Sequence, residues 1–142
     1  MKSSFKLLLE IAVVISLFSS ITQAFCVYNR LEGDGPSFLV YNVIEDFGRA
    51  FKKEIAQGGK ECCPYDNGDC VIGRQRDYPL SLYIKFGFDR MAPREIKRLY
   101  TIQCEGGAGI SVTGSNFDNI GYTCFKANGD VTQERLRDWV TA

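Results

Sequence analysis

The chain contains no histidine among its 142 residues. Serine, cysteine and many metal-dependent hydrolases use histidine as their usual base, so that route to catalysis is excluded. The six cysteines include no C-x-x-C pair, which is the spacing typical of a zinc site. We therefore expect neither a metal ion nor any other cofactor.

An excess of charge of one sign is also missing, because 17 Lys and Arg residues balance 17 Asp and Glu residues. A near-neutral chain is a poor candidate for binding nucleic acid or an anionic membrane, since both attract concentrated positive charge. The longest apolar run, at the N-terminus, is shorter than the roughly 20 residues that a membrane-spanning helix needs. We expect no nucleic-acid partner and no membrane association.

The first 24 residues have the three parts of a secretory signal peptide. Two lysines precede an apolar segment at residues 7–18, and a more polar run then ends at the small residue Ala24. Glu10 is an unusual charge within the apolar segment. We expect this segment to be removed and the protein to be secreted, with residues 25–142 as a single extracellular domain.

The expected mature chain has 118 of the 142 residues, which is enough to bury a core that disulfides reinforce rather than replace. Removal of Lys2, Lys6 and Glu10 leaves 15 basic and 16 acidic residues, and the net charge becomes −1. No N-x-S/T sequon is present, so N-glycosylation is not expected. We expect a monomer.

All six cysteines lie after Ala24, and their even number fits disulfide formation in an oxidising compartment. Adjacent Cys62 and Cys63 are poor partners for each other, because a disulfide requires well-separated Cα atoms. We expect one of them to close a small loop with Cys70 and the other to reach a distant strand. Six cysteines allow 15 connectivities, and the sequence does not choose among them. The remaining candidates are Cys26, Cys104 and Cys124.

Residues 58–70 hold half of the cysteines together with many turn-forming residues, and they are expected to form an irregular, covalently pinned loop. Short strands are expected around it. The clearest is residues 79–88, where Leu80, Leu82 and Ile84 begin an alternation that continues with two phenylalanines. The other expected strands are residues 25–30, 37–44, 49–56, 96–104, 110–113 and 121–127.

Two segments have mixed signals. Residues 45–57 place Phe47, Phe51 and Ile55 at helical spacing, but Gly48 interrupts them; we favour a strand and leave a helix open. Residues 131–140 have a possible N-cap at Thr132 and are expected to form a short closing helix. About seven short strands without a βαβ rhythm favour an all-β fold, a disulfide-reinforced antiparallel β-sandwich.

Carboxylate chemistry of the glycosidase kind is the catalytic route that needs no histidine. The available acids lie in no recognisable motif, and acids on loops are more often solvated turn residues. We therefore expect a protein that is not an enzyme. The acids considered are Glu61, Asp66, Asp69, Glu105 and Asp118.

Two groups of residues are candidates for binding. Tyr65 lies inside the cysteine loop and Tyr78 follows it, and amphipathic tyrosines on loops suit contact with protein or sugar. The densest basic cluster would meet an acidic partner or a polysaccharide, although such clusters are usually a solvated face. It consists of Arg90, Arg94, Lys97 and Arg98.

Three short motifs carry a family likeness. They are Cys26-Val27-Tyr28-Asn29, then Gly58-Gly59 leading to Cys62-Cys63-Pro64-Tyr65, and later Cys104-Glu105-Gly106-Gly107. In this order they resemble small secreted cysteine-rich proteins of filamentous fungi, including the strigolactone-induced secreted proteins of arbuscular mycorrhizal fungi. The resemblance implies an effector-like role in symbiosis or colonisation of a plant host, and it assigns no functional residues.

The expected function is therefore secreted, non-enzymatic binding of a host protein or another apoplastic partner. Two alternatives stay open. One is a protein that binds cell-wall polysaccharide, and the other is a protease inhibitor, since a disulfide-pinned loop is pre-organised for a protease cleft.

Overall fold

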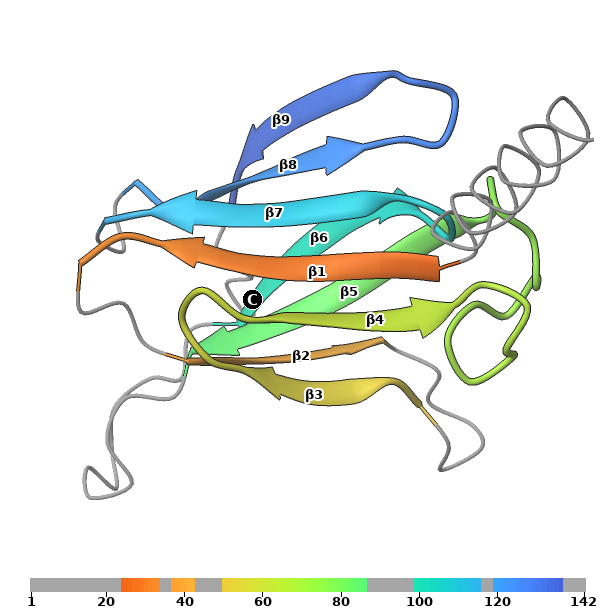
Figure 1. Ribbon diagram of the computed structural model, residues 1–142, viewed down its shortest axis with the longest axis horizontal. Coiled ribbons are helices and arrows are strands. Elements are labelled where there is room, and N and C mark those ends of the chain that lie inside the picture. Colours follow the sequence, from red (N-terminus) through yellow and green to blue (C-terminus); the bar gives the residue numbers. More distant parts are fainter. Residues whose placement is uncertain (1–23, 34–36, 43–49, 87–98, 116–118, 137–142) are drawn as a thin grey trace, which may run out of the picture.

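The computed structural model describes residues 24–33, 37–42, 50–86, 99–115 and 119–136. In this part of the chain, nine strands form two sheets that face each other (Figure 1). The five-stranded sheet has the order β4-β1-β7-β8-β9, and the four-stranded sheet has the order β3-β2-β5-β6. The expected disulfide-reinforced β-sandwich is confirmed.

The strands are short, and all except β4 and β9 lie close to the positions that the sequence predicts. Those of the five-stranded sheet are β1 (Ala24–Leu31), β4 (Lys60–Pro64), β7 (Gly109–Gly114), β8 (Gly121–Phe125) and β9 (Val131–Arg135). Those of the four-stranded sheet are β2 (Phe38–Asn42), β3 (Lys52–Ile55), β5 (Pro79–Phe86) and β6 (Leu99–Glu105).

One neighbouring pair departs from the antiparallel pattern. β1 and β7 run parallel, with Cys26 opposite Gly109 and Leu31 opposite Gly114. Parallel neighbours need a long connection, and here the chain passes through β2 to β6 before it returns to β1. The centre of the five-stranded sheet is therefore built from segments that are far apart in the sequence.

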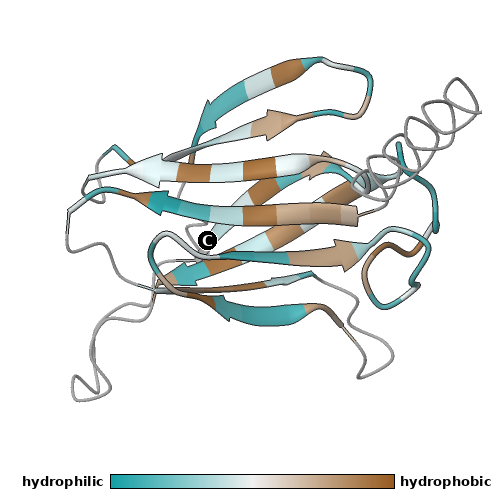
Figure 2. Cartoon of the chain, viewed as in Figure 1, coloured by the Kyte–Doolittle hydropathy of each residue, from teal (hydrophilic) through white to brown (hydrophobic). Residues whose placement is uncertain are grey.

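Alternation along the strands builds the core. β1 buries Phe25, Val27, Asn29 and Leu31 and turns the residues between them toward solvent, as an amphipathic strand should. Figure 2 shows the same alternation of hydropathy along β7. Edge-to-face ring contacts add to the packing of the core: one joins β1 to the residue that precedes β3, and two lie within the four-stranded sheet. These contacts are Phe25–Phe51 at 5.0 Å, Phe38–Phe86 at 5.7 Å and Phe86–Tyr100 at 5.5 Å between centroids.

Asn29 is a fully buried amide that joins β1 to the turn between β3 and β4. Its Nδ2 donates to the carbonyl of Ile55 at 3.0 Å, and its Oδ1 accepts from the N–H of Leu31 at 3.2 Å. Its backbone exchanges hydrogen bonds with Gly58 and Gly59. Since β3 and β4 belong to different sheets, Asn29 fixes the point at which the chain crosses between them.

Three disulfides involve all six cysteines. Cys26–Cys62 joins neighbouring strands β1 and β4, and Cys63–Cys70 closes the small loop after β4. The expectation that Cys62 and Cys63 have different partners, one of them Cys70, is confirmed. The third disulfide, Cys104–Cys124, joins β6 to β8 and so links the two sheets.

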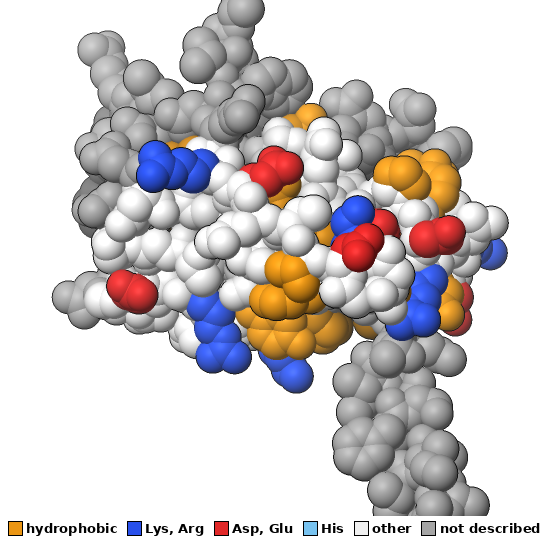
Figure 3. Space-filling view, turned by 90° about the horizontal axis from the view of Figure 1, so that it is seen from above, with side chains coloured by type: hydrophobic (Ala, Val, Ile, Leu, Met, Phe, Trp, Pro, Cys, Tyr) orange, Lys and Arg blue, Asp and Glu red, His pale blue; other side chains and the backbone are white. Residues whose placement is uncertain are grey.

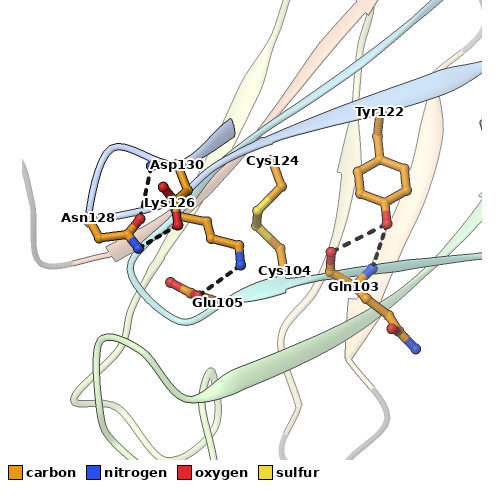
Figure 4. Close-up of polar contacts among 8 residues, drawn as sticks. All are labelled: Gln103, Cys104, Glu105, Tyr122, Cys124, Lys126, Asn128 and Asp130. Atoms are coloured by element: carbon orange, nitrogen blue, oxygen red, sulfur yellow. Dashed lines mark hydrogen bonds and ion pairs between the residues drawn. A yellow bond between two sulfur atoms is a disulfide. The ribbon is translucent and has the colours of Figure 1, made fainter. Parts of the chain in front are cut away.

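Polar contacts flank this inter-sheet disulfide on both sides (Figure 4). The Tyr122 hydroxyl accepts from the N–H of Gln103 at 3.3 Å. The same hydroxyl oxygen lies 3.4 Å from the Gln103 carbonyl oxygen and 3.2 Å from Glu134 Oε2, and it can donate its proton to either. On the other side, the Lys126 ammonium lies 3.4 Å from the Glu105 carboxylate.

Two expectations about local structure are corrected. Residues 58–70 are not irregular throughout, because β4 pairs with β1 from Tyr28–Lys60 to Ala24–Pro64. The closing helix expected at residues 131–140 is wrong in its first half, because Val131–Arg135 forms β9. The turn at Asn128-Gly129, where Gly129 has φ +94°, returns the chain along β8, and strand pairing overrides the weak helical pattern.

The ambiguous segment is a strand where it is described, since Lys52–Ile55 pairs with β2 as β3. Residues 43–49 and 137–142 lie outside the described residues, as does the expected signal segment at residues 1–23. Within the described ranges, no helix is long and apolar enough to cross a membrane.

Replacing both cysteines of the inter-sheet disulfide, Cys104→Ala with Cys124→Ala, is expected to lower the free energy of unfolding by about 3 kcal/mol, because the bond closes a 20-residue separation. The matched control is Cys63→Ala with Cys70→Ala, which opens a 7-residue separation and is expected to cost about 2 kcal/mol. Urea unfolding of the oxidised proteins measures both. A larger loss for the control pair would contradict the expectation.

Burial raises the pKa of Tyr122 above its ordinary value of 10.0, the Gln103 backbone lowers it, and the Glu134 carboxylate raises it. A raised pKa means that the folded state holds the proton more tightly, so stability is complete below about pH 10 and declines as the pH rises through the folded-state pKa. Tyr122→Phe removes this group. Its free energy of unfolding is expected to decline less steeply above about pH 10 than that of the wild type.

The measurement is urea unfolding at several alkaline pH values, completed rapidly to preserve the disulfides. At neutral pH the same variant should be about 1 kcal/mol less stable, because the hydroxyl's hydrogen bonds are lost. If the free energy of unfolding declined equally with pH in both proteins, the loss of stability above about pH 10 would not come from Tyr122.

Candidate functional site

The outer side of the five-stranded sheet is the most distinctive described surface. We call it the five-strand face. Alternating burial and strand register define its outward positions. These are Ala24, Cys26, Tyr28 and Arg30 on β1; Lys60, Cys62 and Pro64 on β4; Gly109, Ser111 and Thr113 on β7; Gly121, Thr123 and Phe125 on β8; and Val131, Gln133 and Arg135 on β9.

An apolar strip crosses this face. Gly109 lies between two aromatic residues, and a Cβ placed on it would be 3.9 Å from the Tyr28 ring and 3.8 Å from the Phe125 side chain. Phe125 is 49% exposed and lies opposite Val131, which is 59% exposed. Tyr28 and Phe125 thus lie on either side of Gly109, at distances that would leave a Cβ there in ordinary contact with both.

Positive charge accompanies the aromatic residues. The Arg30 guanidinium lies 5.9 Å from the centroid of the Tyr28 ring, and the Lys60 ammonium lies 6.0 Å from it. Arg135 is on the same face, three strands away from Arg30. Figure 3, which views the molecule from above, shows hydrophobic side chains on the surface with Lys and Arg side chains beside them and Asp and Glu side chains nearby.

A row of small polar side chains continues from Tyr28 across the sheet. The register aligns Lys60, Tyr28, Ser111, Thr123 and Gln133 on five successive strands. Their hydroxyl and amide groups are donors and acceptors. The five-strand face therefore combines aromatic rings, hydroxyls, an amide and cations, and none of its sixteen outward positions is acidic.

The outer side of the four-stranded sheet is different. Tyr41 and Tyr83 pair across β2 and β5 with ring centroids 5.5 Å apart and planes at 33°. Burial, and then the neighbouring Tyr83, raise the pKa of Tyr41 above its ordinary value. The charges around this pair have both signs. They are Lys52, which is opposite Tyr41, and Glu54 and Lys85, which are both opposite Leu39.

The two tyrosines that the sequence singled out take part in packing. Tyr65 and Tyr78 are half-buried and contact the hydrophobic core. The Tyr78 ring also lies against the backbone of Gly73, where a Cβ would come within 2.0 Å of it. Their role in binding stays a prediction. The basic residues Arg90, Arg94, Lys97 and Arg98 lie outside the described residues.

The loop closed by Cys63–Cys70 is folded on itself. The N–H groups of Cys70 and Val71 donate to the carbonyl of Asn67 at 2.9 and 3.0 Å. Buried Asn42 holds the end of the loop through Nδ2, which donates to the Cys70 carbonyl at 2.9 Å. The loop is therefore anchored to the sandwich.

The acids considered for catalysis do not converge on one place in the described chain. Asp66 and Asp69 are exposed on the cysteine loop. Glu105 is paired with Lys126, on the opposite side of the inter-sheet disulfide from Tyr122 (Figure 4). Asp118 lies outside the described residues. Among the residues that are described, no cluster of acids or cysteines could hold a metal ion.

Sequence reasoning missed the members of the five-strand face. Outward positions can be read from strand alternation, so Tyr28, Arg30 and Phe125 could each have been placed on the outer side of a sheet. Their grouping could not be read, because it depends on the parallel pairing of β1 with β7 and on β4 joining β1.

Comparisons with known proteins provide no relative for this chain. No family model matches the sequence, and neither a curated protein nor a solved structure matches it. The likeness to secreted fungal proteins thus stays a prediction drawn from the sequence.

Gly73→Ala tests whether Tyr78 is held in place by the backbone beneath it. The new Cβ would overlap the Tyr78 ring, so we expect the free energy of unfolding to fall by about 1–3 kcal/mol. Gly109→Ala is the matched control, because its nearest contacts are ordinary at 3.8–3.9 Å and its stability should change little. Thermal and urea unfolding compare them. Equal stability of the two variants would mean that the Tyr78 ring moves freely.

Proposed function

We propose that this chain is a secreted, non-enzymatic binding protein that acts outside the cell and uses the five-strand face as its binding surface. The observation that carries the proposal is the grouping on this face of two aromatic residues and three cations, with no acidic outward position. Three intramolecular disulfides, which are typical of extracellular proteins, support the compartment.

In this proposal the partner is a molecule found outside a host cell. The resemblance noted in the sequence implies a fungus–plant interface, where the available partners are host proteins and wall polysaccharides. The five-strand face favours the second class, because a sheet surface with the exposed Phe125 ring, the half-buried Tyr28 ring and several hydroxyl groups suits an extended sugar chain better than a compact ligand.

Protease inhibition receives less support. An inhibitor that imitates a substrate presents an extended segment to the protease. The backbone after Cys63 instead turns back through hydrogen bonds to Pro64 and Asn67. Tyr65, in the middle of this loop, packs against the core.

The test is retention of the oxidised protein on isolated plant cell walls and, separately, capture of soluble apoplastic protein. The variant is Tyr28→Ala, which removes the ring between Arg30 and Lys60. The control is Tyr41→Ala, which removes a ring from the outer side of the other sheet. We expect the wild type to be retained, with about tenfold weaker retention for Tyr28→Ala and no change for Tyr41→Ala.

Thermal unfolding of each variant confirms that the fold is intact before the comparison. Equal retention of wild type and Tyr28→Ala, or no retention of wild type by either material, would contradict the proposal.

A further inference from the structure

We propose that the five-strand face binds an acidic polysaccharide, with the Tyr28 ring packed on a sugar ring and with Arg30, Lys60 and Arg135 paired with carboxylate groups along the polymer. This inference rests on the proposed function and names the class of its ligand.

The first argument is the separation of charge. The mature chain as expected has a net charge of −1, yet the outward positions of this sheet carry three cations and no acid. The acids on its strands point the other way: Glu61 is opposite buried Val27, and Glu134 accepts from buried Tyr122. Glu32 and Asp130 lie beyond the ends of β1 and β9. The grouping of cations at the described outward positions of this face therefore follows from strand register.

The second argument is that these charges are not neutralised within the described structure. The ion pair found there joins Lys126 to Glu105, and no carboxylate in the described ranges pairs with Arg30, Lys60 or Arg135. Arg30 and Lys60 contact the Tyr28 ring instead. An incoming carboxylate would meet cations already positioned beside an aromatic ring, and an arginine can bind it through two hydrogen bonds.

The third argument is the spacing of the cations. Arg30 and Arg135 occupy the same cross-strand row, with β7 and β8 between them. Three inter-strand steps of about 4.8 Å place their Cα atoms about 14 Å apart. One small anion cannot reach both. A ligand that uses both must repeat its acidic groups along its length, as a polyuronate does.

The fourth argument is the surface between the cations. The row from Lys60 to Gln133 crosses four inter-strand gaps, about 19 Å. Tyr28 offers an apolar ring, and Ser111, Thr123 and Gln133 offer groups that can bond sugar hydroxyls. A sugar chain lying across the strands would meet these groups in turn.

Other polyanions fit less well. Protein interfaces are enriched in Tyr, Phe and Arg, which this face also carries, but their centres are poor in Lys and Ser, and here Lys60 and Ser111 adjoin Tyr28. Nucleic-acid binding depends on neutralising several phosphates, about 6–10 in strongly salt-dependent cases. Three cations on a near-neutral chain do not supply that number.

The experiment measures affinity for three soluble polymers by titration calorimetry and affinity electrophoresis. They are polygalacturonate, the same polymer fully methyl-esterified, and a neutral β-glucan. The variants are Arg30→Gln with Lys60→Gln, and Tyr28→Ala. The control is Lys52→Gln with Lys85→Gln, which removes two cations from the outer side of the other sheet.

We expect the wild type to bind polygalacturonate and to bind its methyl ester about tenfold more weakly. Arg30→Gln with Lys60→Gln should weaken polygalacturonate binding by about tenfold and should reduce its dependence on salt. The control should bind as the wild type does. Tyr28→Ala should weaken binding to the acidic and esterified polymers alike, because the ring contacts the sugar rather than the carboxylate.

Three outcomes would overturn the inference. If the esterified polymer or the glucan binds as well as polygalacturonate and Tyr28→Ala abolishes it, the face is a sugar-binding surface without acid preference and the proposed function stands. If the face captures a host protein and no polymer, the proposed function also stands. If polymer binding is the same in wild type and Tyr28→Ala, the face is not the binding surface and both proposals fail.

Discussion

The covalent link between β6 and β8 is the constraint on which the arrangement of the two sheets depends. Cys104 and Cys124 join an edge strand of one sheet to an inner strand of the other, and Tyr122 and Lys126 make polar contacts with β6 on either side of the bond. With the sheets held face to face, the apolar side of each sheet is covered by the other. In the part of the chain that the structure describes, no further layer covers the opposite side of the five-stranded sheet, which is the binding surface that we propose.

A second set of contacts determines what that surface carries. β4 has one neighbour in its sheet, and it is kept beside β1 by Cys26–Cys62 and by the buried amide of Asn29 at the preceding turn. This pairing places Lys60 opposite Tyr28. The parallel pairing of β1 with β7 places Gly109 between Tyr28 and Phe125. The Cys26–Cys62 disulfide and Asn29 thus hold the strands of the proposed binding surface together, and we assign neither of them a contact with the ligand.

Much of the fold was predictable because it follows from local patterns. The alternation from Leu80 to Phe86 predicted β5, and the geometry of adjacent cysteines predicted separate partners for Cys62 and Cys63. Prediction was wrong where a weak local preference competed with pairing across strands. Residues 131–135 have some helical character, but the exposed edge of β8 and the turn at Gly129 make a strand more favourable.

The sequence by itself determined the β-sandwich, the exclusion of histidine-dependent catalysis and the expectation of an oxidised chain, because these follow from residue types and from spacing within a segment. The tertiary structure alone decided which cysteines pair across the sheets and which outward residues become neighbours. Tyr28 and Phe125 are nearly one hundred positions apart, and they lie on either side of Gly109 because strand order is set by burial of the whole core. Alternation shows which way a side chain points, but it does not show what lies beside it.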